Sequence, residues 1–261
     1  MVRTFLVRGM LVGVVAGLLS FGFLRVYGEP QVDRAIAFET RMDEAQHTAE
    51  HAHAAHAAEH AHATAHVTEQ EPELVSRSVQ AGLGLFVAVV VYSTAFGGLF
   101  GLAFAFAYGR LPGDPAPQVL SALLAGLGFV AIYLVPNLKY PANPPAVGSH
   151  ETIGVRTALY FIMIAISLAA MIGSTSLKRF CVPRFGEWNA NLIVAACYIV
   201  VVGLAALLLP AVNEVPDGFP AAVLWQFRVA AIGAQLIMWT TLGLLFGALT
   251  QRAFASAKLS S

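Results

Sequence analysis

Residues 83–108 read LGLFVAVVVYSTAFGGLFGLAFAFAY, a run without a single charged side chain. A helix needs about 20 predominantly apolar residues to span a lipid bilayer, and this run is long enough. Five further stretches qualify or nearly qualify: 6–24, 117–135, 157–177, 190–212 and 229–249. The sequence therefore predicts an all-α integral membrane protein, a bundle of six transmembrane helices.

The composition of the 261-residue chain agrees with this fold class. The chain is 57% hydrophobic and only 11% charged, whereas a soluble domain carries about 25% charged residues. Fifteen basic and fifteen acidic residues cancel, so no net charge would attract nucleic acid. Two cysteines, Cys181 and Cys197, are too few for a disulfide scaffold or a cysteine-rich zinc module.

The first apolar stretch decides between six helices and five. Arg8 lies within it and must extend its side chain toward the membrane surface. Together with Arg3 it also resembles the basic start of a signal peptide. However, Phe21, Phe23 and Leu24 crowd the end at which a cleavage site would need small residues. We expect a retained helix, with five helices as the alternative.

Basic residues predict the orientation, because cytoplasmic loops carry an excess of Lys and Arg. With the N-terminus inside, the cytoplasmic side holds Arg3, Arg8, Arg110, Lys178, Arg179, Arg184, Arg252 and Lys258. The short outer loops hold Lys139, Arg156 and Arg228. Both termini are therefore predicted to be cytoplasmic, and the first, third and fifth loops to lie outside.

The chain divides into four parts on this prediction. Residues 1–28 form the first transmembrane helix, 29–76 an extracytoplasmic loop, 77–252 a five-helix transmembrane bundle and 253–261 a cytoplasmic tail. Ten of the fifteen acidic residues lie between Glu29 and Glu73, and no glycine or proline occurs between Pro30 and Pro72. The Ala/Glu-rich loop is compatible with helix and equally with disorder in the absence of a ligand.

Glycines recur four residues apart in the predicted spans. Gly9, Gly13 and Gly17 form one stripe, and the pairs Gly97/Gly101 and Gly243/Gly247 repeat the spacing. Such stripes let helix backbones approach closely. The pattern favours packing within the bundle over a dimer interface or a sliding surface.

Seven histidines fall within the first outer loop. They are His47, His51, His53, His56, His60, His62 and His66. Spacings of three and four residues place pairs of imidazoles on one helix face, and imidazole is a ligand for zinc, copper, nickel, cobalt and iron(II). The tract predicts labile binding of a divalent transition metal as substrate, with no permanently bound cofactor. The alternative is a solvated linker that responds to pH.

No motif in the chain predicts an enzyme. A P-loop, a Ser/His/Asp arrangement and a His-Glu-x-x-His motif are all missing from the sequence. The spacings His47/His51, His56/His60 and His62/His66 match the boxes of membrane di-iron desaturases and hydroxylases. In those enzymes the boxes come from separate cytoplasmic loops, whereas here all lie in one outer loop.

The polar residues near the outer ends of the spans form a candidate transport path. Proline-containing connections follow the third and fifth spans, and prolines free carbonyls from the helical hydrogen-bond ladder. Carboxylate and amide oxygens there would replace the water shell of an entering ion. The predicted path residues are Glu29, Asp33, Asn137, Asn143, Asn213, Glu214 and, within the last span, Gln235.

The chain resembles the CbtA-type predicted cobalt transporter subunits of bacteria over nearly its whole length. The matching stretches are 28–30 (GEP), 32–39 (VDRAIAFE), the histidine tract, 73–77 (ELVSR), 106–110 (FAYGR), 139–148 (KYPANPPAVG), 152–157 (TIGVRT) and 209–216 (LPAVNEVP). The resemblance implies cobalt uptake across the cytoplasmic membrane, linked to cobalamin biosynthesis. It also implies a small one-span partner subunit with histidines of its own.

Two functions follow from these observations. The first is a cytoplasmic-membrane importer of cobalt or a similar divalent metal, whose outer histidines capture the ion. The second is a non-conducting accessory or sensor protein that binds metal outside. Export remains an alternative direction for the first.

Overall fold

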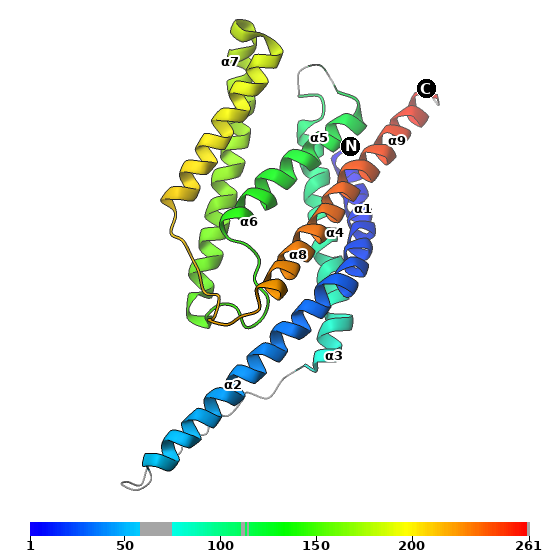
Figure 1. Cartoon of the computed structure of the whole chain (residues 1–261). Coiled ribbons are helices and arrows are strands. Elements are labelled where there is room, and N and C mark those ends of the chain that lie inside the picture. The colour runs from blue at the N-terminus through cyan, green and yellow to red at the C-terminus, as the bar shows by residue number, and fades with distance from the viewer. Residues whose placement is uncertain (58–74, 111–112, 114, 260–261) are drawn as a thin grey trace.

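The computed structural model describes residues 1–57, 75–110, 113 and 115–259, and the regular structure within them is helical (Figure 1). In these residues five helices are long and apolar enough to cross a membrane. They are Val2–Thr48, Arg77–Ala107, Pro117–Lys139, Ile153–Leu208 and Ala221–Ser256. The predicted all-α, multi-span class is confirmed.

Several of these helices contain a π-helical turn. The first comprises α1 (Val2–Phe23), the turn Leu24–Gly28 and α2 (Glu29–Ala57). The second comprises α3 (Arg77–Val79), the turn Gln80–Gly84 and α4 (Leu85–Ala107). The third comprises α5 (Pro117–Gly128), the turn Phe129–Leu134 and α6 (Val135–Lys139). A 3₁₀ turn, His150–Thr152, precedes α7 (Ile153–Leu208). The last comprises α8 (Ala221–Thr241), the turn Leu242–Phe246 and α9 (Gly247–Leu259).

Two of the π-helical turns end two positions before a proline. Pro30 follows the turn Leu24–Gly28, and Pro136 follows the turn Phe129–Leu134. Proline has no N–H and its ring clashes with the carbonyl four residues earlier, so we attribute these wider turns to the prolines. The helix continues through Pro136 and ends at Lys139. By contrast, α7 ends at Leu208, two residues before Pro210.

The first helix runs without interruption from the apolar segment into the histidine tract. Residues 29–57 are helical throughout, which agrees with the helical interpretation of this part of the loop. The boundary proposed between residues 28 and 29 therefore falls inside a helix. Residues 58–74 of the predicted loop lie outside the described structure.

The 56 residues of α7 form a hairpin of two arms. Gly186 has a φ of 75° and a ψ of 167°, a conformation that is costly for residues with a Cβ. The hydroxyls of Ser167 and Tyr198 are 2.8 Å apart, although 31 residues of straight helix would separate them by roughly 46 Å. The arms therefore lie side by side (Figure 1). They contain the predicted fourth and fifth spans, and the count of six bilayer crossings stays a prediction.

The glycine stripes bring α1 and α4 into backbone contact. A Cβ built on Gly9 would lie 2.1 Å from the carbonyl oxygen of Gly97, and one on Gly13 would lie 2.3 Å from that of Ser93. Such distances leave no room for a side chain. A Cβ on Gly243 would lie 2.7 Å from the Cβ of Ala125, in α5. The predicted packing of these stripes within the bundle is confirmed.

The segments predicted to be outer loops meet at one end of the molecule. Ala35 of α2 is buried with Val147, Phe219 and Val223, and the ring of Phe38 packs on that of Phe219 at 5.0 Å. We call this the α2 end. Figure 1 places both termini, the reversal of α7 and the end of α4 at the opposite end.

Candidate functional site

A cavity of about 660 Å³ lies at the α2 end, among α6, the start of α7, the segment that follows α7 and the start of α8. This volume is in the range of small-molecule binding sites. Its polar lining residues are Tyr133, Asn137, Tyr140, Asn143, Arg156, Thr157, Tyr160, Asn213, Glu214 and Arg228. The two proline-containing connections singled out in the sequence thus meet around one cavity.

Side chains hold the irregular connection between α6 and α7 in place. The side-chain oxygen of Asn137 accepts the N–H of Ala142 at 3.3 Å. Arg228, on α8, donates to the carbonyl of Ala142 at 3.3 Å and to the side-chain oxygen of Asn143 at 2.9 Å. These bonds satisfy backbone and amide groups that no helix pairs. They also anchor Arg228 at the cavity wall.

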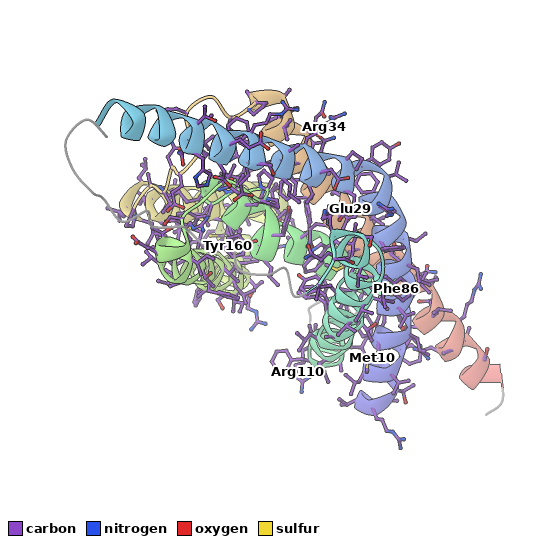
Figure 2. The ribbon with its side chains drawn as sticks, turned by 90° about the horizontal axis from the view of Figure 1, so that it is seen from below. Met10, Glu29, Arg34, Phe86, Arg110 and Tyr160 are labelled. Carbon is purple, nitrogen blue, oxygen red and sulfur yellow. The ribbon has the colours of Figure 1, made fainter. Side chains whose placement is uncertain are left out.

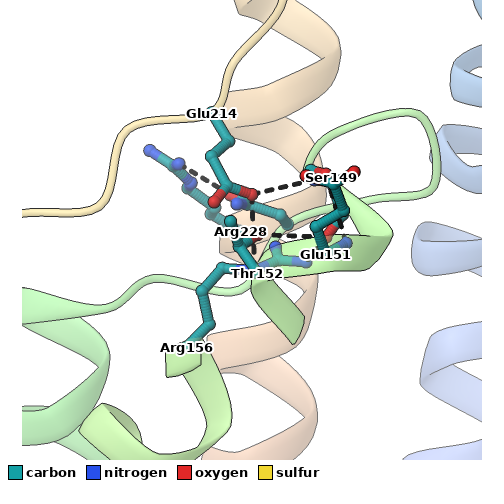
Figure 3. Close-up of polar contacts among 7 residues, drawn as sticks. Ser149, Glu151, Thr152, Arg156, Glu214 and Arg228 are labelled. Atoms are coloured by element: carbon teal, nitrogen blue, oxygen red, sulfur yellow. Dashed lines mark hydrogen bonds and ion pairs between the residues drawn. The ribbon is translucent and has the colours of Figure 1, made fainter. Parts of the chain in front are cut away.

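Glu214 joins the segment after α7 to the segment before it (Figure 3). Its carboxylate accepts the backbone N–H of Ser149 at 2.9 Å. One carboxylate oxygen lies 3.4 Å from Nε of Arg156. The guanidinium of Arg156 also donates to the carbonyl of Ser149 at 3.2 Å. This cluster therefore ties together the two ends of the α7 hairpin.

The surroundings of Glu214 favour its ionised form. The Thr152 side chain, the Ser149 N–H and the charge of Arg156 hold the pKa of Glu214 below its ordinary value. A carboxyl whose pKa is lowered by folding contributes stability above its ordinary pKa and loses it as the pH falls through the lowered value. We therefore expect the cluster to persist at neutral and mildly acidic pH.

Glu29 and Asp33 lie apart from the cavity, and both form ion pairs with one arginine, Arg77. Arg77, at the start of α3, forms an ion pair with Glu29 and another with Asp33 at 2.9 Å. Glu29 is buried, with its side chain 8% exposed. Viewed from below, Glu29 and the cavity residue Tyr160 lie on different helices (Figure 2). These two carboxylates fasten the base of α2 to the second helix.

Gln235 lies neither at the α2-end cavity nor beside Arg77, but in a separate cavity within the bundle. With Ser20, Tyr92 and Ser93 it lines a cavity of about 330 Å³ between α1, α4 and α8. Of the seven predicted path residues, the structure thus gathers Asn137, Asn143, Asn213 and Glu214, and it separates the other three from them. Their common role in transport stays a prediction.

One comparison with known proteins gives a family. A family model described as "probable cobalt transporter subunit (CbtA)" matches residues 2–251. The chain belongs to the CbtA family. No curated protein and no solved structure gives a match. Membership together with the long apolar helices makes this chain a multi-pass membrane protein of a transporter-subunit family, as the resemblance implied.

The histidines of this CbtA-family chain lie partly within the described structure. His47 is exposed on α2, and the same helix carries positions 51, 53 and 56. His60, His62 and His66 fall outside the described residues. Within the described residues no three His, Cys, Asp or Glu side chains are grouped as metal ligands. Metal binding by the tract stays a prediction.

Arg156 and Arg228 were not assigned to the site from the sequence. Both are charges that bear on the topology, because each lies close to the end of a predicted span. The tyrosines Tyr133 and Tyr160 were not singled out, since an aromatic residue in an apolar run resembles any other core residue. The available signal was a basic residue at the outer end of a span, where the positive-inside rule disfavours one.

Proposed function

We propose that this chain is a cytoplasmic-membrane transporter subunit that takes up cobalt or a similar divalent metal. The histidines on and beyond α2 capture the ion outside the membrane. The cavity at the α2 end then receives it, and both termini lie in the cytoplasm. The family supports cobalt as the substrate.

The observation that carries this proposal is the contact between the histidine-bearing helix and the cavity. Phe38 of α2 packs on Phe219, and Ala35 is buried in one cluster with Val147, which also lines the cavity. The first histidine, His47, follows Phe38 by nine residues on the same helix, about 14 Å along its axis, so the helix leads from the histidines to the cavity wall. High local concentration at a mouth raises the rate of capture.

The distribution of basic residues supports inward transport. Arg3, Arg110, Arg179 and Arg252 belong to the end opposite the cavity, and such an end is cytoplasmic by the positive-inside rule. A doubly charged cation that enters down an inside-negative potential of 100 mV gains about 4.6 kcal/mol, twice the value for one charge. The membrane potential is thus a sufficient driving force for a chain without a nucleotide-binding motif.

Elemental analysis of cells tests the function directly. Cells that express this chain alone are offered cobalt, nickel and zinc at low concentration, with the protein verified in the membrane. We expect selective accumulation of cobalt. No accumulation, either alone or with a small one-span histidine-containing partner subunit coexpressed, would contradict the proposal.

Replacing the seven histidines by glutamine should raise the cobalt concentration needed for half-maximal uptake and leave maximal uptake unchanged. Glutamine keeps the helical tendency and length of the segment but removes the imidazole ligands. The readout is the concentration dependence of cobalt accumulation, with His150→Gln as the control outside the tract. A change in maximal uptake alone would contradict the capture role.

The second candidate is a non-conducting metal-binding accessory or sensor protein. It is favoured by the lack of acidic residues within the predicted spans, since carboxylates inside the membrane mark many ion pathways. This function predicts that the glutamine variant loses all activity. It also predicts that no metal crosses a membrane that contains only this chain.

A further inference from the structure

The cavity at the α2 end carries more positive than negative charge. Its charged lining residues are Arg156, Arg228 and Glu214. Glu214 already bonds to Ser149 and lies against Arg156, so its carboxylate is engaged by the protein. In the described part of the chain, no carboxylate lies within 4.0 Å of the Arg228 guanidinium. One net positive charge therefore faces the cavity.

The uncharged polar groups of the cavity add hydrogen-bond donors. Arg228 uses Nε and one Nη in the bonds to Ala142 and Asn143, and the other Nη makes no hydrogen bond among the described residues. The hydroxyl of Tyr133 is buried, and it too has no partner in the described structure. The oxygen of Asn137 is occupied by Ala142, which leaves its N–H groups for a ligand.

Such a set of groups recognises an anion. A guanidinium with a free edge, a phenol and an amide N–H bind carboxylate oxygens by charge-assisted hydrogen bonds. A bare divalent cation at the same place would face two guanidiniums and one engaged carboxylate. Like charges disfavour it there, because the partly buried site screens them less than water does.

We propose that the cavity binds a carboxylate, and that the metal reaches it as a complex with a small carboxylate-bearing chelator. Arg228 holds one carboxylate of the chelator, and the hydroxyl of Tyr133 donates to the same ligand. The cavity volume of about 660 Å³ accommodates such a complex. This inference rests on the proposed function and defines the form in which the metal reaches the cavity. The chelator stays outside, and the membrane potential acts on the cation that crosses.

Equilibrium dialysis of the full-length protein in detergent tests the inference, with ¹⁴C-citrate as the probe, alone and with cobalt. We expect saturable citrate binding that cobalt strengthens. Arg228→Gln should weaken it about tenfold or more, the size expected for the loss of a hydrogen bond to a charged group. Arg34→Gln is the matched control, because Arg34 lies at the same end, outside the cavity, and bonds to Gln31 and Gln226.

A cobalt titration without citrate tests the alternative that the cavity binds the bare metal ion. If the cavity binds bare cobalt, Arg228→Gln should tighten cobalt binding, since it removes a repelling charge; that result overturns the inference. Citrate binding that is the same in Arg228→Gln as in the wild type also overturns the inference. So does a phospholipid that copurifies with the wild type and is absent from Arg228→Gln, if this variant still binds citrate. Tyr133→Phe supplies a second variant if Arg228→Gln does not fold, and it should weaken citrate binding.

The two proposals fail separately. Citrate binding that depends on Arg228, without cobalt accumulation in cells, would remove the importer function and leave the carboxylate site. Cobalt accumulation that Arg228→Gln leaves unchanged would keep the importer and remove the chelate.

Discussion

Cells that express the Glu214→Ala variant are expected to accumulate no more cobalt than cells that lack the protein. Alanine removes the acceptor for the Ser149 N–H and the counter-charge of Arg156. It also unfastens the two ends of the α7 hairpin from each other, so the cavity that they border is no longer held in shape. Elemental analysis of the cells measures the effect, with the amount of variant in the membrane quantified beside it.

Two further variants separate charge from shape in this cluster. Glu214→Gln keeps an oxygen for the Ser149 N–H but loses the ion pair, so its uptake should lie between that of the wild type and that of alanine. Glu151→Ala is the matched control, because Glu151 is an exposed carboxylate on the segment before α7, which Glu214 contacts, and it has no ion pair in the described structure. Unchanged uptake in Glu214→Ala would show that the cavity does not serve transport.

Adding one methyl group to α1 should have opposite effects at two glycines. In Gly13→Ala the new Cβ would lie 2.3 Å from the carbonyl oxygen of Ser93 and 2.9 Å from Cα of Thr94. Both are backbone atoms, so the helices must separate. Overpacking a core costs roughly 1–3 kcal/mol, and we expect a loss of at least the upper value here. The measurement is the thermal unfolding midpoint in detergent, which should fall.

Gly22→Ala on the same helix is the control. Nothing lies within 4 Å of a Cβ at this position, and alanine favours a helix over glycine by about 0.8–1 kcal/mol. This variant should unfold at the same temperature as the wild type or slightly above it. Equal losses for both variants would indicate that α1 and α4 do not pack as described.

The fold class could be predicted from the sequence because a long apolar run can adopt few structures in a membrane. Residues 83–108 and the other apolar stretches must pair their backbone groups internally, and a helix does so without any partner segment. The glycine spacing of four also carried information, since it places small residues on one helix face. Both are properties of a single segment.

The hairpin of α7 shows what the local sequence pattern predicted and what it did not. The sequence predicted two spans separated by the polar residues around Gly186, and the two arms agree with it. The contact of Ser167 with Tyr198, 31 residues away, depends on how the arms turn about each other. A hydropathy profile does not predict how one arm is rotated relative to the other.

The candidate site was predicted in part, for a similar reason. Asn137, Asn143, Asn213 and Glu214, which line one cavity, were singled out because prolines mark irregular backbone, and irregular backbone in a membrane protein lines a cavity. Glu29 and Asp33 looked equivalent to them in sequence. The pairing with Arg77 separates these two carboxylates from the cavity, and it joins residues more than 40 positions apart.

The sequence by itself determined that this is an all-helical membrane protein, since burial in lipid and the glycine spacing act within single segments. Its resemblance to the CbtA family was carried by particular stretches such as 139–148. Only the tertiary structure decided which polar residues meet. Arg156 and Arg228 approach the cavity from α7 and α8, and with Glu214 the charge there is a sum over residues from three segments. That sum depends on distances between segments, which a one-dimensional pattern does not contain.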